Sequence, residues 1–497
     1  GGRLLKQDEF EFTLSSTDDA DNATQTVKNN ADGTVVFANL KYDQEDIGKT
    51  YNYKVVEKVP TPQEGGMTYS ANILTFKVTV TDAGGGVLTA TKSDITGETE
   101  FVNVYKAKGE FDVNAGIGVT KRLDAGGRLL KQDEFEFTLS STDDADNATQ
   151  TVKNNADGTV VFANLKYDQE DIGKTYSYKV VEKVPTPQEG GMTYSANILT
   201  FKVKVTDAGG GILIATKSDV TGDTEFVNEY KAKGEFDVNA GIGVTKRLDA
   251  GGRLLKAGEF SFTLNSTDDP DNNQTVTNAA DGTVIFANLK YDQADIGKTY
   301  NYKVVEKVPT PPEGGMTYSA NVLTFKVKVT DAGGGVLTAT KSDVTGDTEF
   351  VNEYKAKGEY DIKALLNPRK ELSGRPLENQ EFNFSLWLDN QQIQSVKNNA
   401  DGTIPFDKLT YTEADIGKTF IYTISEVVPE VPAAGITYDT MVLTFKITVT
   451  DAGNGQLAIK AEKPKDLTFN NIYVDPKKPN LQHPWGGVYF NLGDCFE

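Results

Sequence analysis

The run DGTVVFANLKYDQEDIGKTY fills residues 157–176 and stands unchanged at residues 32–51. A slightly altered version begins at Asp281, and a diverged one, DGTIPFDKLTYTEADIGKTF, begins at Asp401. Recurrence of so long a run identifies an internal repeat. The first three copies are near-duplicates, which suits an array whose purpose is reach.

The chain divides into four repeats and a tail. Its 497 residues predict three to four domains of ordinary size. The pentapeptide GGRLL recurs at residues 1, 126 and 251, a period of 125 residues. We predict these boundaries: repeat 1, 1–108, with its first strand missing; repeat 2, 109–233; repeat 3, 234–357; repeat 4, 358–474, which is divergent; spacer and tail, 475–497.

Apolar and polar side chains alternate along short runs of each repeat. In repeat 2 the apolar positions of three such runs are Phe135, Phe137 and Leu139; Tyr176, Tyr178 and Val180; Phe201, Val203 and Val205. This period of two is typical of half-buried strands, and Asp-Gly, Pro-x-Pro and Gly-rich turn signals separate the runs. No stretch of ten or more residues carries a helical period. The sequence therefore predicts an all-β fold of tandem immunoglobulin-like β-sandwich domains.

Composition excludes several classes of protein. The net charge is −21, and so acidic a surface repels phosphate backbones, which argues against nucleic-acid binding. No run of about 20 apolar residues predicts a membrane span. The one cysteine, Cys495, cannot form a disulfide within the chain. No secretory signal opens the chain, but it begins inside a repeat and reads as a segment of something longer, so this does not argue against export.

Three strands of repeat 2 each place one polar residue on their apolar face. The sets that share a face are Val119, Lys121 and Leu123; Tyr178, Val180 and Glu182; Phe226, Asn228 and Tyr230. A lone buried ammonium or carboxylate is costly and normally shifts its pKa until it is neutral. Three such groups in one core require an explanation.

An amine, an acid and an amide together supply one. Desolvation lowers the pKa of a lysine and raises that of a glutamate. The lysine then offers a free amine, and the glutamate a carboxylic acid that donates to the asparagine carbonyl and shuttles protons. Attack of the amine on the side-chain amide expels ammonia and leaves a neutral amide between the first and last strands. The residues predict an acyl transfer that a repeat performs once, on itself.

The order of motifs resembles a known repeat. The pattern K-x-L, G-R-x-L, E-F-x-F-x-L, DGT, Y-x-Y-x-V-x-E and F-x-N-x-Y is similar to the isopeptide-linkage repeat of Gram-positive major pilins and adhesin stalks, from residue 1 to about 474. In that family a first-strand Lys bonds to a last-strand Asn, assisted by a Glu from the facing sheet. The resemblance implies these sets: Lys121, Glu182 and Asn228 in repeat 2; Lys246, Glu306 and Asn352 in repeat 3; Lys370, Glu426 and Asn471 in repeat 4.

Repeat 1 departs from this pattern. It has Glu57 and Asn103, but its lysine falls before Gly1, so no internal bond of the usual kind is expected and Asn103 is unpaired. We hypothesise that this repeat accepts a lysine-bearing strand supplied in trans. A second pairing is open as well, because a bond from Lys121 to Asn103 would link neighbouring repeats. The long pairing of Lys121 with Asn228 is preferred, since it closes one whole sandwich and matches the family.

The resemblance implies a structural stalk of a cell-surface adhesin or pilus, outside a Gram-positive cell and on its wall. The implied partners are neighbouring domains of the same stalk and a host ligand reached through a tip domain that is not in this chain. The chain is expected to turn over no substrate and to hold no cofactor or metal. The alternatives are a ligand-binding adhesin module and a sortase-polymerised backbone pilin; the latter needs an acceptor lysine and a sorting signal, neither of which can be assigned.

Two further segments bear on metal binding and on anchoring. The Asp-rich loop 142–147 offers carboxylates for calcium, but it lacks the spacing and glycine of a known loop and has no equivalent in repeat 4, which favours a solvated loop. Residues 474–480 form a Pro/Lys spacer. Residues 481–497 hold His483 and Cys495, the only residues of their kinds, and are interpreted as an unrelated end. No LPxTG-like sorting signal is visible, so wall anchoring follows from the resemblance alone.

Overall fold

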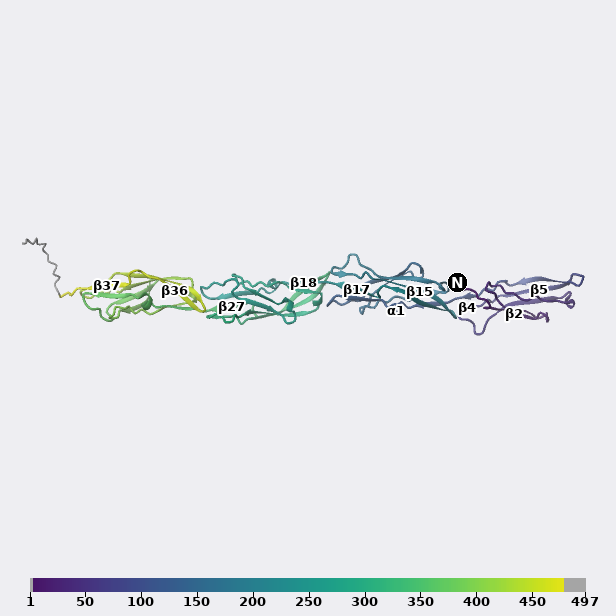
Figure 1. Ribbon diagram of the computed structural model, residues 1–497, viewed down its shortest axis with the longest axis horizontal. Coiled ribbons are helices and arrows are strands. Elements are labelled where there is room, and N and C mark those ends of the chain that lie inside the picture. Colours follow the sequence, from purple (N-terminus) through teal and green to yellow (C-terminus); the bar gives the residue numbers. More distant parts are fainter. Residues whose placement is uncertain (1–2, 478–497) are drawn as a thin grey trace, which may run out of the picture. The chain divides into compact units, whose positions relative to one another are not determined.

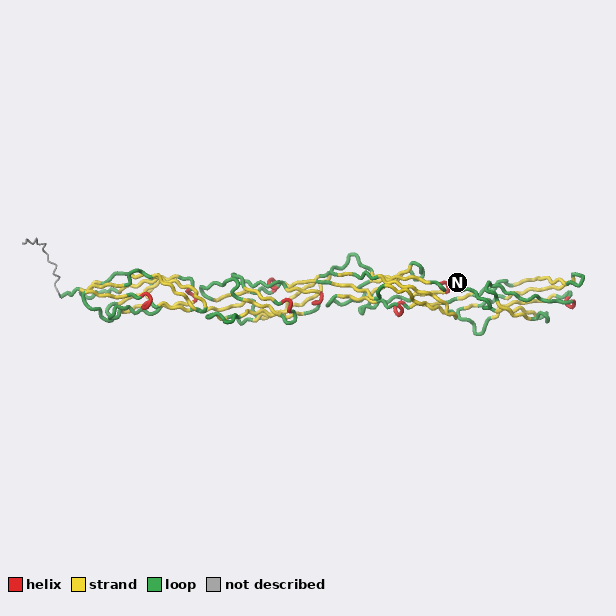
Figure 2. The backbone as a smooth tube through the Cα atoms, in the orientation of Figure 1, coloured by secondary structure: helices red, strands yellow, loops and turns green. Residues whose placement is uncertain are grey.

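The computed structural model describes residues 3–477, and strands dominate it (Figures 1 and 2). Within these residues the longest helix has five residues, which confirms the all-β fold class. The helical turns are α1 (Val113–Gly116), α2 (Val238–Gly241), the π-helix η5 (Ile362–Leu366) and the 3-10 turns η1 (Gln44–Asp46), η2 (Gln169–Asp171), η3 (Pro270–Asn272), η4 (Gln293–Asp295) and η6 (Glu413–Asp415). The tail with His483 and Cys495 lies outside the described residues.

The chain forms two compact units. The first comprises Gly1–Gly234, Tyr291–Gly297 and Thr330–Thr338; the second comprises Glu235–Lys290, Lys298–Val329 and Ala339–Glu497. Repeats 1 and 2 lie in the first unit. Repeat 4 and most of repeat 3 lie in the second.

Repeat 2 is a sandwich of two sheets. A seven-stranded sheet has the order β11-β10-β13-β15-β16-β8-β12, and a three-stranded sheet has the order β14-β17-β9. The bounds are β8 (Lys108–Phe111), β9 (Thr120–Asp124), β10 (Glu136–Ser141), β11 (Thr149–Lys153), β12 (Leu165–Asp168), β13 (Thr175–Glu182), β14 (Met192–Thr193), β15 (Ile198–Gly209), β16 (Ile212–Thr221) and β17 (Glu225–Tyr230). Alternate side chains of these strands meet between the sheets, and the core includes Phe137, Tyr178, Val180, Phe201 and Phe226, as the period of two predicts.

Repeats 3 and 4 contain equivalent strands. Those of repeat 3 are β18 (Lys233–Phe236), β19 (Thr245–Asp249), β20 (Ser261–Asn265), β21 (Gln274–Thr277), β22 (Leu289–Asp292), β23 (Thr299–Lys307), β24 (Met316–Thr317), β25 (Val322–Gly333), β26 (Val336–Thr345) and β27 (Glu349–Tyr354). Those of repeat 4 are β28 (Lys357–Tyr360), β29 (Arg369–Ser373), β30 (Asn383–Leu388), β31 (Gln391–Lys397), β32 (Leu409–Thr412), β33 (Thr419–Glu426), β34 (Ile436–Thr437), β35 (Val442–Gly453), β36 (Gln456–Glu462) and β37 (Thr468–Tyr473). In repeat 3, β19 pairs in parallel with β27. In repeat 4, β29 pairs in parallel with β37.

Repeat 1 has fewer strands. Its larger sheet has only five, in the order β2-β1-β3-β5-β6, and its smaller sheet only β4 and β7. The bounds are β1 (Glu11–Ser16), β2 (Thr24–Lys28), β3 (Thr50–Lys58), β4 (Met67–Thr68), β5 (Ile73–Asp82), β6 (Leu88–Thr96) and β7 (Val104–Tyr105). Residues 3–106 form no counterpart of β8 or β9. The last strand is two residues long in β7 and six in β17, because residues 3–106 supply no neighbour like the one that β9 gives to β17.

Repeats 1 and 2 contact each other through a tyrosine at the end of β7. The Tyr105 hydroxyl donates to Asp207 Oδ1 at 2.9 Å and accepts from Gly211 N at 3.1 Å. The Arg3 guanidinium lies over the Tyr105 ring, 4.4 Å from its centre. At Gly65, a Cβ atom would meet the Gly210 carbonyl at 2.4 Å, so this approach requires glycine. The two repeats are therefore joined by specific contacts as well as by the short linker.

The junction of repeats 3 and 4 repeats this arrangement within the second unit. The Tyr354 hydroxyl donates to Asp451 Oδ1 at 2.7 Å and accepts from Gly455 N at 3.1 Å. Arg253 lies over the Tyr354 ring at 4.2 Å, and its Nε is 3.6 Å from Asp451 Oδ2. We call each such set of Arg, Tyr and Asp a junction contact: Arg3, Tyr105 and Asp207 between repeats 1 and 2, and Arg253, Tyr354 and Asp451 between repeats 3 and 4.

Candidate functional site

Three elements of repeat 2 bring an amine, a carboxyl group and an amide together. Lys121 lies on β9, Asn228 on the neighbouring β17 and Glu182 at the end of β13 in the facing sheet. Lys121 Nζ is 2.8 Å from Glu182 Oε2, and Asn228 Nδ2 donates to Glu182 Oε1 at 2.6 Å. The side chains of Lys121 and Glu182 are wholly inaccessible to solvent, and Asn228 is fully buried. The carboxyl group therefore bridges the first and last strands of the sandwich.

Repeats 3 and 4 contain the same arrangement. In repeat 3, Glu306 is 2.9 Å from Lys246 Nζ and accepts from Asn352 Nδ2 at 2.6 Å. In repeat 4 the corresponding distances from Glu426 are 2.8 Å to Lys370 Nζ and 2.6 Å to Asn471 Nδ2. Repeat 4 keeps this geometry although its sequence has diverged, so the three groups are maintained against a changed background.

Burial disfavours charge in these sites. It lowers the pKa of the Lys121, Lys246 and Lys370 amines below the usual lysine value, although each contacts a carboxyl group. Burial likewise raises the pKa of the Glu426 carboxyl in repeat 4. Both shifts favour the neutral pair of amine and carboxylic acid over the ion pair. A neutral amine is the form that can act as a nucleophile.

Two contacts of each site were not predicted from the sequence. The Phe135 ring lies under Lys121 Nζ, with its centre at 4.6 Å, and Phe260 and Phe382 lie equivalently in repeats 3 and 4. The Ser195 backbone N–H donates to Asn228 Oδ1 at 2.7 Å. The alternation of Phe135 with Phe137 places the ring on the core face and could have indicated its role. No sequence signal marks a backbone N–H.

The asparagine amide is oriented differently from the sequence-based expectation. The sequence predicts that the glutamic acid donates to the asparagine carbonyl. In the structure Glu182 faces the amide nitrogen, Asn228 Nδ2, while the carbonyl oxygen accepts from Ser195 N. The same N–H contact is made by Ser319 in repeat 3 and by Asp439 in repeat 4, each at 2.7 Å. The difference arises because the backbone N–H already occupies the carbonyl.

Among residues 3–106, the acid and the amide of repeat 1 lie together with no lysine amine beside them. Asn103 Nδ2 donates to Glu57 Oε1 at 2.5 Å, and Ser70 N donates to Asn103 Oδ1 at 2.7 Å. The Glu182 carboxyl group contacts both Lys121 and Asn228, whereas Asn103 contacts Glu57. The alternative pairing of Lys121 with Asn103 therefore has no shared carboxyl group to assist it.

The Asp-rich loop of repeat 2 uses its carboxylates within the protein. Asp143 accepts from Ser141 Oγ at 2.7 Å and from Ser177 N at 3.1 Å. Asp144 accepts from Asn147 Nδ2 at 2.9 Å and from the Tyr178 hydroxyl. Among residues 3–477, no group of three or more His, Cys, Asp or Glu side chains is arranged to hold a metal ion. These hydrogen bonds give the aspartates a structural role in fixing the loop against β13.

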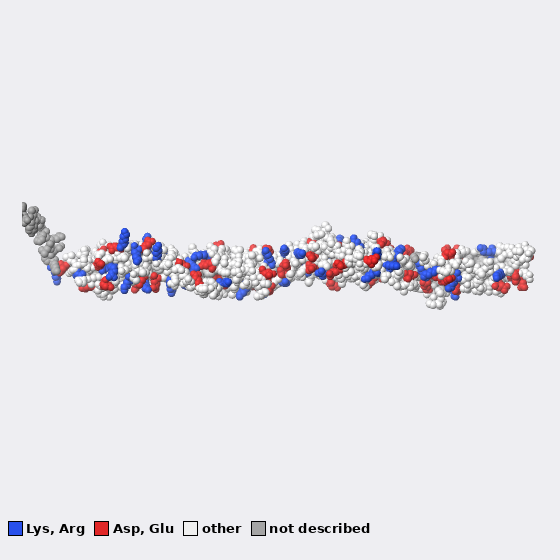
Figure 3. All heavy atoms as spheres, in the orientation of Figure 1, with Lys and Arg blue, Asp and Glu red and all other residues white. Residues whose placement is uncertain are grey.

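The surface charge and the hydropathy of residues 3–477 mark no additional site. On the face drawn in Figure 3, acidic and basic side chains are interspersed. None of the helices formed by residues 3–477 is both long and apolar enough to cross a membrane.

Comparison with known proteins assigns the family. The model of the FctA family, described as a Spy0128-like isopeptide containing domain, matches residues 1–106, 117–231, 242–355 and 366–474. No curated protein sequence matches the chain. Among solved structures, a mutant of the major pilin from Streptococcus pyogenes is 15% identical with a TM-score of 0.17, over 50% of this chain and 97% of that one. The pilus adhesin SpaC from Lactobacillus rhamnosus GG is 14% identical with a TM-score of 0.14, over 81% of this chain and 46% of that one.

Scores this low for whole chains carry no argument, so the assignment depends on the family match. That match occurs four times, once in each repeat, and covers most of the sequence. The chain therefore belongs to the FctA family of Spy0128-like isopeptide-containing domains.

Proposed function

We propose that this chain is a structural stalk of a Gram-positive surface adhesin or pilus, in which repeats 2, 3 and 4 are each closed by a Lys–Asn isopeptide bond. The observation that carries the proposal is the buried set of amine, carboxyl group and amide, which occurs three times with contacts of 2.6–2.9 Å. The neighbouring domains of the stalk are its partners, and the outer face of the cell wall is its location. The only chemistry proposed is one acyl transfer per repeat.

We propose a step for each group of repeat 2, supported by the contacts described above. In the neutral pair, Lys121 Nζ attacks Asn228 Cγ. Ser195 N–H stabilises the negative charge that develops on Asn228 Oδ1. Glu182 gives its proton to Nδ2, the Cγ–Nδ2 bond breaks and ammonia leaves, and Glu182 regains a proton from the attacking Nζ. Since Glu182 contacts both nitrogens, one carboxyl group serves both transfers, and the product is an uncharged amide between β9 and β17.

The bond matters for a stalk because of where it lies. The chain enters each repeat near its first strands and leaves it through its last strand. In repeat 2 the bond joins β9 directly to its parallel neighbour β17. Tension then passes across the covalent link without unravelling the strands between them. By analogy with a disulfide, closing a loop of about 100 residues stabilises the folded state by about 5 kcal/mol, with no dependence on redox conditions.

Single-molecule force spectroscopy on the full chain tests the stalk proposal. Residues 3–106 hold no lysine in the position of Lys121, so repeat 1 should extend once, by roughly 350 Å for about 105 residues at about 3.4 Å each. Repeats 2, 3 and 4 should not extend. The variant Glu182→Gln should add one further extension of roughly 400 Å, while Glu229→Gln, a surface change beside Asn228, should add none. Four extensions in the unaltered chain would contradict a covalently closed stalk.

A further inference from the structure

The backbone N–H that contacts each asparagine carbonyl belongs to a segment that is itself fixed by side-chain hydrogen bonds. In repeat 2 this segment follows β14 and runs from Ser195 to Asn197. Asn197 Nδ2 donates to the Asp223 carbonyl at 2.6 Å, and Asp223 N donates to Asn197 Oδ1 at 3.2 Å. One side-chain amide thus ties the segment that carries the Ser195 N–H to the residues just before β17. We call these two hydrogen bonds the amide clamp.

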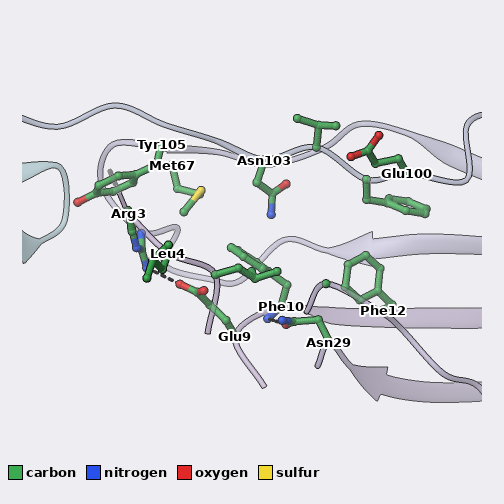
Figure 4. Close-up of a pocket in the computed structure, with 14 residues that line it drawn as sticks. Arg3, Leu4, Glu9, Phe10, Phe12, Asn29, Met67, Glu100, Asn103 and Tyr105 are labelled. Carbon is green, nitrogen blue, oxygen red and sulfur yellow. Dashed lines mark hydrogen bonds and ion pairs between the residues drawn. The ribbon is translucent and has the colours of Figure 1, made fainter. Parts of the chain in front are cut away.

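Repeats 1 and 3 contain the same amide clamp. Its two hydrogen bonds are 2.6 and 3.2 Å long between Asn321 and Asp347 in repeat 3, and between Asn72 and Glu98 in repeat 1. The Asn103 side chain points into the pocket drawn in Figure 4, and it accepts at 2.7 Å from the backbone N–H two residues before Asn72. None of the described residues that line this pocket is a lysine. The contact between N–H and carbonyl therefore forms without an amine beside the amide.

Repeat 4 joins the same two segments by a different side chain. The position of the clamp asparagine is taken by Met441, which packs against the core, and the position of Ser195 is taken by Asp439. Asp439 Oδ2 accepts from Asn470 N at 2.6 Å, and Oδ1 accepts from Met441 N at 2.8 Å. Asp439 N still donates to Asn471 Oδ1 at 2.7 Å. A carboxylate clamp in repeat 4 thus replaces the amide clamp.

The segment needs a clamp because the sheet does not hold it. In repeat 2, β14 pairs with β17 through Met192 and Thr193, and this pairing ends before Ser195. A donor stabilises the charge that develops on a carbonyl oxygen only when it is already in place as the reaction occurs. A displacement of about 1 Å can lower a rate by about 10²-fold. Bond formation should therefore depend on the side chain that fixes the segment.

We propose that Asn197, Asn321 and Asp439 are positioning residues for bond formation in repeats 2, 3 and 4. Each holds a backbone N–H on the carbonyl oxygen of the amide that the lysine attacks. Their side chains contact neither the amine nor the reacting carbon, so they act through the backbone that they fix. This inference rests on the proposed isopeptide chemistry. It implies that the amide clamp and the carboxylate clamp perform the same task and can be exchanged.

The test follows bond formation in newly made chains, since a chain purified from cells has had time to react. The full chain is synthesised in a cell-free translation mixture, synthesis is stopped, and samples are quenched in acidic denaturant at intervals. Peptide mass spectra give the linked fraction of each repeat. A brief protease pulse on parallel samples gives the folded fraction. Repeats 2 and 3 of the same molecules are the internal reference for a change in repeat 4.

The variant Asp439→Ala should slow bond formation in folded repeat 4 by about tenfold or more, and leave repeats 2 and 3 unchanged. Asp439→Ser combined with Met441→Asn installs the amide clamp and should restore the rate. The matched control is Asp466→Ala, which removes a carboxylate that accepts from the first backbone N–H of β37 and should leave the rate unchanged. A merely structural clamp would alter the folded fraction but not the rate within folded molecules.

The outcomes separate this inference from the proposed function. If folded Asp439→Ala closes repeat 4 at the unaltered rate, the positioning role is refuted and the proposed function stands. Failure of the double change to restore the rate would refute the shared task of the two clamps. If Asp439→Ala does not fold, Asn197→Ala and Asn321→Ala decide the question in repeats 2 and 3. If no repeat of the unaltered chain loses ammonia, the bond chemistry itself fails.

Discussion

Lys370 and Glu426 show how burial prepares residues for reaction. Both side chains are inaccessible to solvent and lie 2.8 Å apart. Burial lowers the pKa of Lys370 and raises that of Glu426, so the folded state favours the proton on the carboxyl group and leaves the amine neutral. Once the amine has formed an amide with Asn471, it can no longer be protonated. An unreacted pair should therefore lower the free energy of unfolding measurably.

In the variant Asn471→Ala, where the pair stays unreacted, the free energy of unfolding should depend on pH. The raised pKa of Glu426 makes stability fall as pH rises from about 4.3 through the folded-state value. The lowered pKa of Lys370 makes stability rise again as pH climbs from the folded-state value toward about 10.4. The free energy of unfolding of repeat 4 should therefore pass through a minimum between these two windows, where the unfolded chain holds both groups charged and the folded interior disfavours those charges.

Urea titrations followed by the fluorescence of Trp387 in β30 measure this, because only two tryptophans occur in the chain and the other, Trp485, can be changed to Phe. The matched control is the triple variant Asn471→Ala, Lys370→Met and Glu426→Gln, which has neither titrating group. Subtracting its profile should isolate the minimum. Identical profiles for the two variants would refute the assigned pKa shifts.

At the scale of elements, the junction contact links β7 of repeat 1 to β15 of repeat 2. Its tyrosine stands two residues after Asn103, on the strand that contributes the amide. Because the Tyr105 hydroxyl contacts both Asp207 and Gly211, two elements more than 100 residues apart along the chain meet at one side chain. Removing the hydroxyl should loosen the linker without changing either core.

The variant Tyr105→Phe should accelerate tryptic cleavage at Lys106 and Lys108 by about tenfold or more. A hydrogen bond to a charged group contributes about 1.5–3 kcal/mol, and cleavage of a transiently opened segment follows the free energy of opening. Tyr473→Phe is the matched control, since the Tyr473 ring lies under Arg375 but its hydroxyl has no carboxylate partner among residues 3–477. Equal cleavage rates for Tyr105→Phe and the unaltered chain would show that the junction contact does not hold the linker.

The sequence predicts elements better than it predicts contacts between them. The period of two identifies the core faces of β10, β13 and β15, and it places Lys121, Glu182 and Asn228 among apolar neighbours. It cannot show that Glu182 faces the amide nitrogen, because that depends on the Ser195 N–H from another segment. The junction contact is equally hidden, since Tyr105 and Asp207 belong to different repeats and neither is unusual in its own strand.

At the scale of the whole molecule, three independent covalent closures are expected, one in each of repeats 2, 3 and 4. Repeats 2, 3 and 4 each contain a complete set of Lys, Glu and Asn, and residues 3–106 contain only Glu57 and Asn103 in this position. Since the reaction is intramolecular and each site has its own carboxyl group, the three repeats should react without help from one another. Loss of one carboxyl group should therefore affect one repeat alone.

The intact mass of the full chain tests this most directly. We predict a mass below the theoretical value by three ammonia molecules, about 17 Da for each bond. Each of Glu182→Gln, Glu306→Gln and Glu426→Gln should restore one ammonia, while Glu57→Gln should restore none. Tandem mass spectra should locate the links at Lys121–Asn228, Lys246–Asn352 and Lys370–Asn471. The full theoretical mass in folded, unaltered protein would contradict the account.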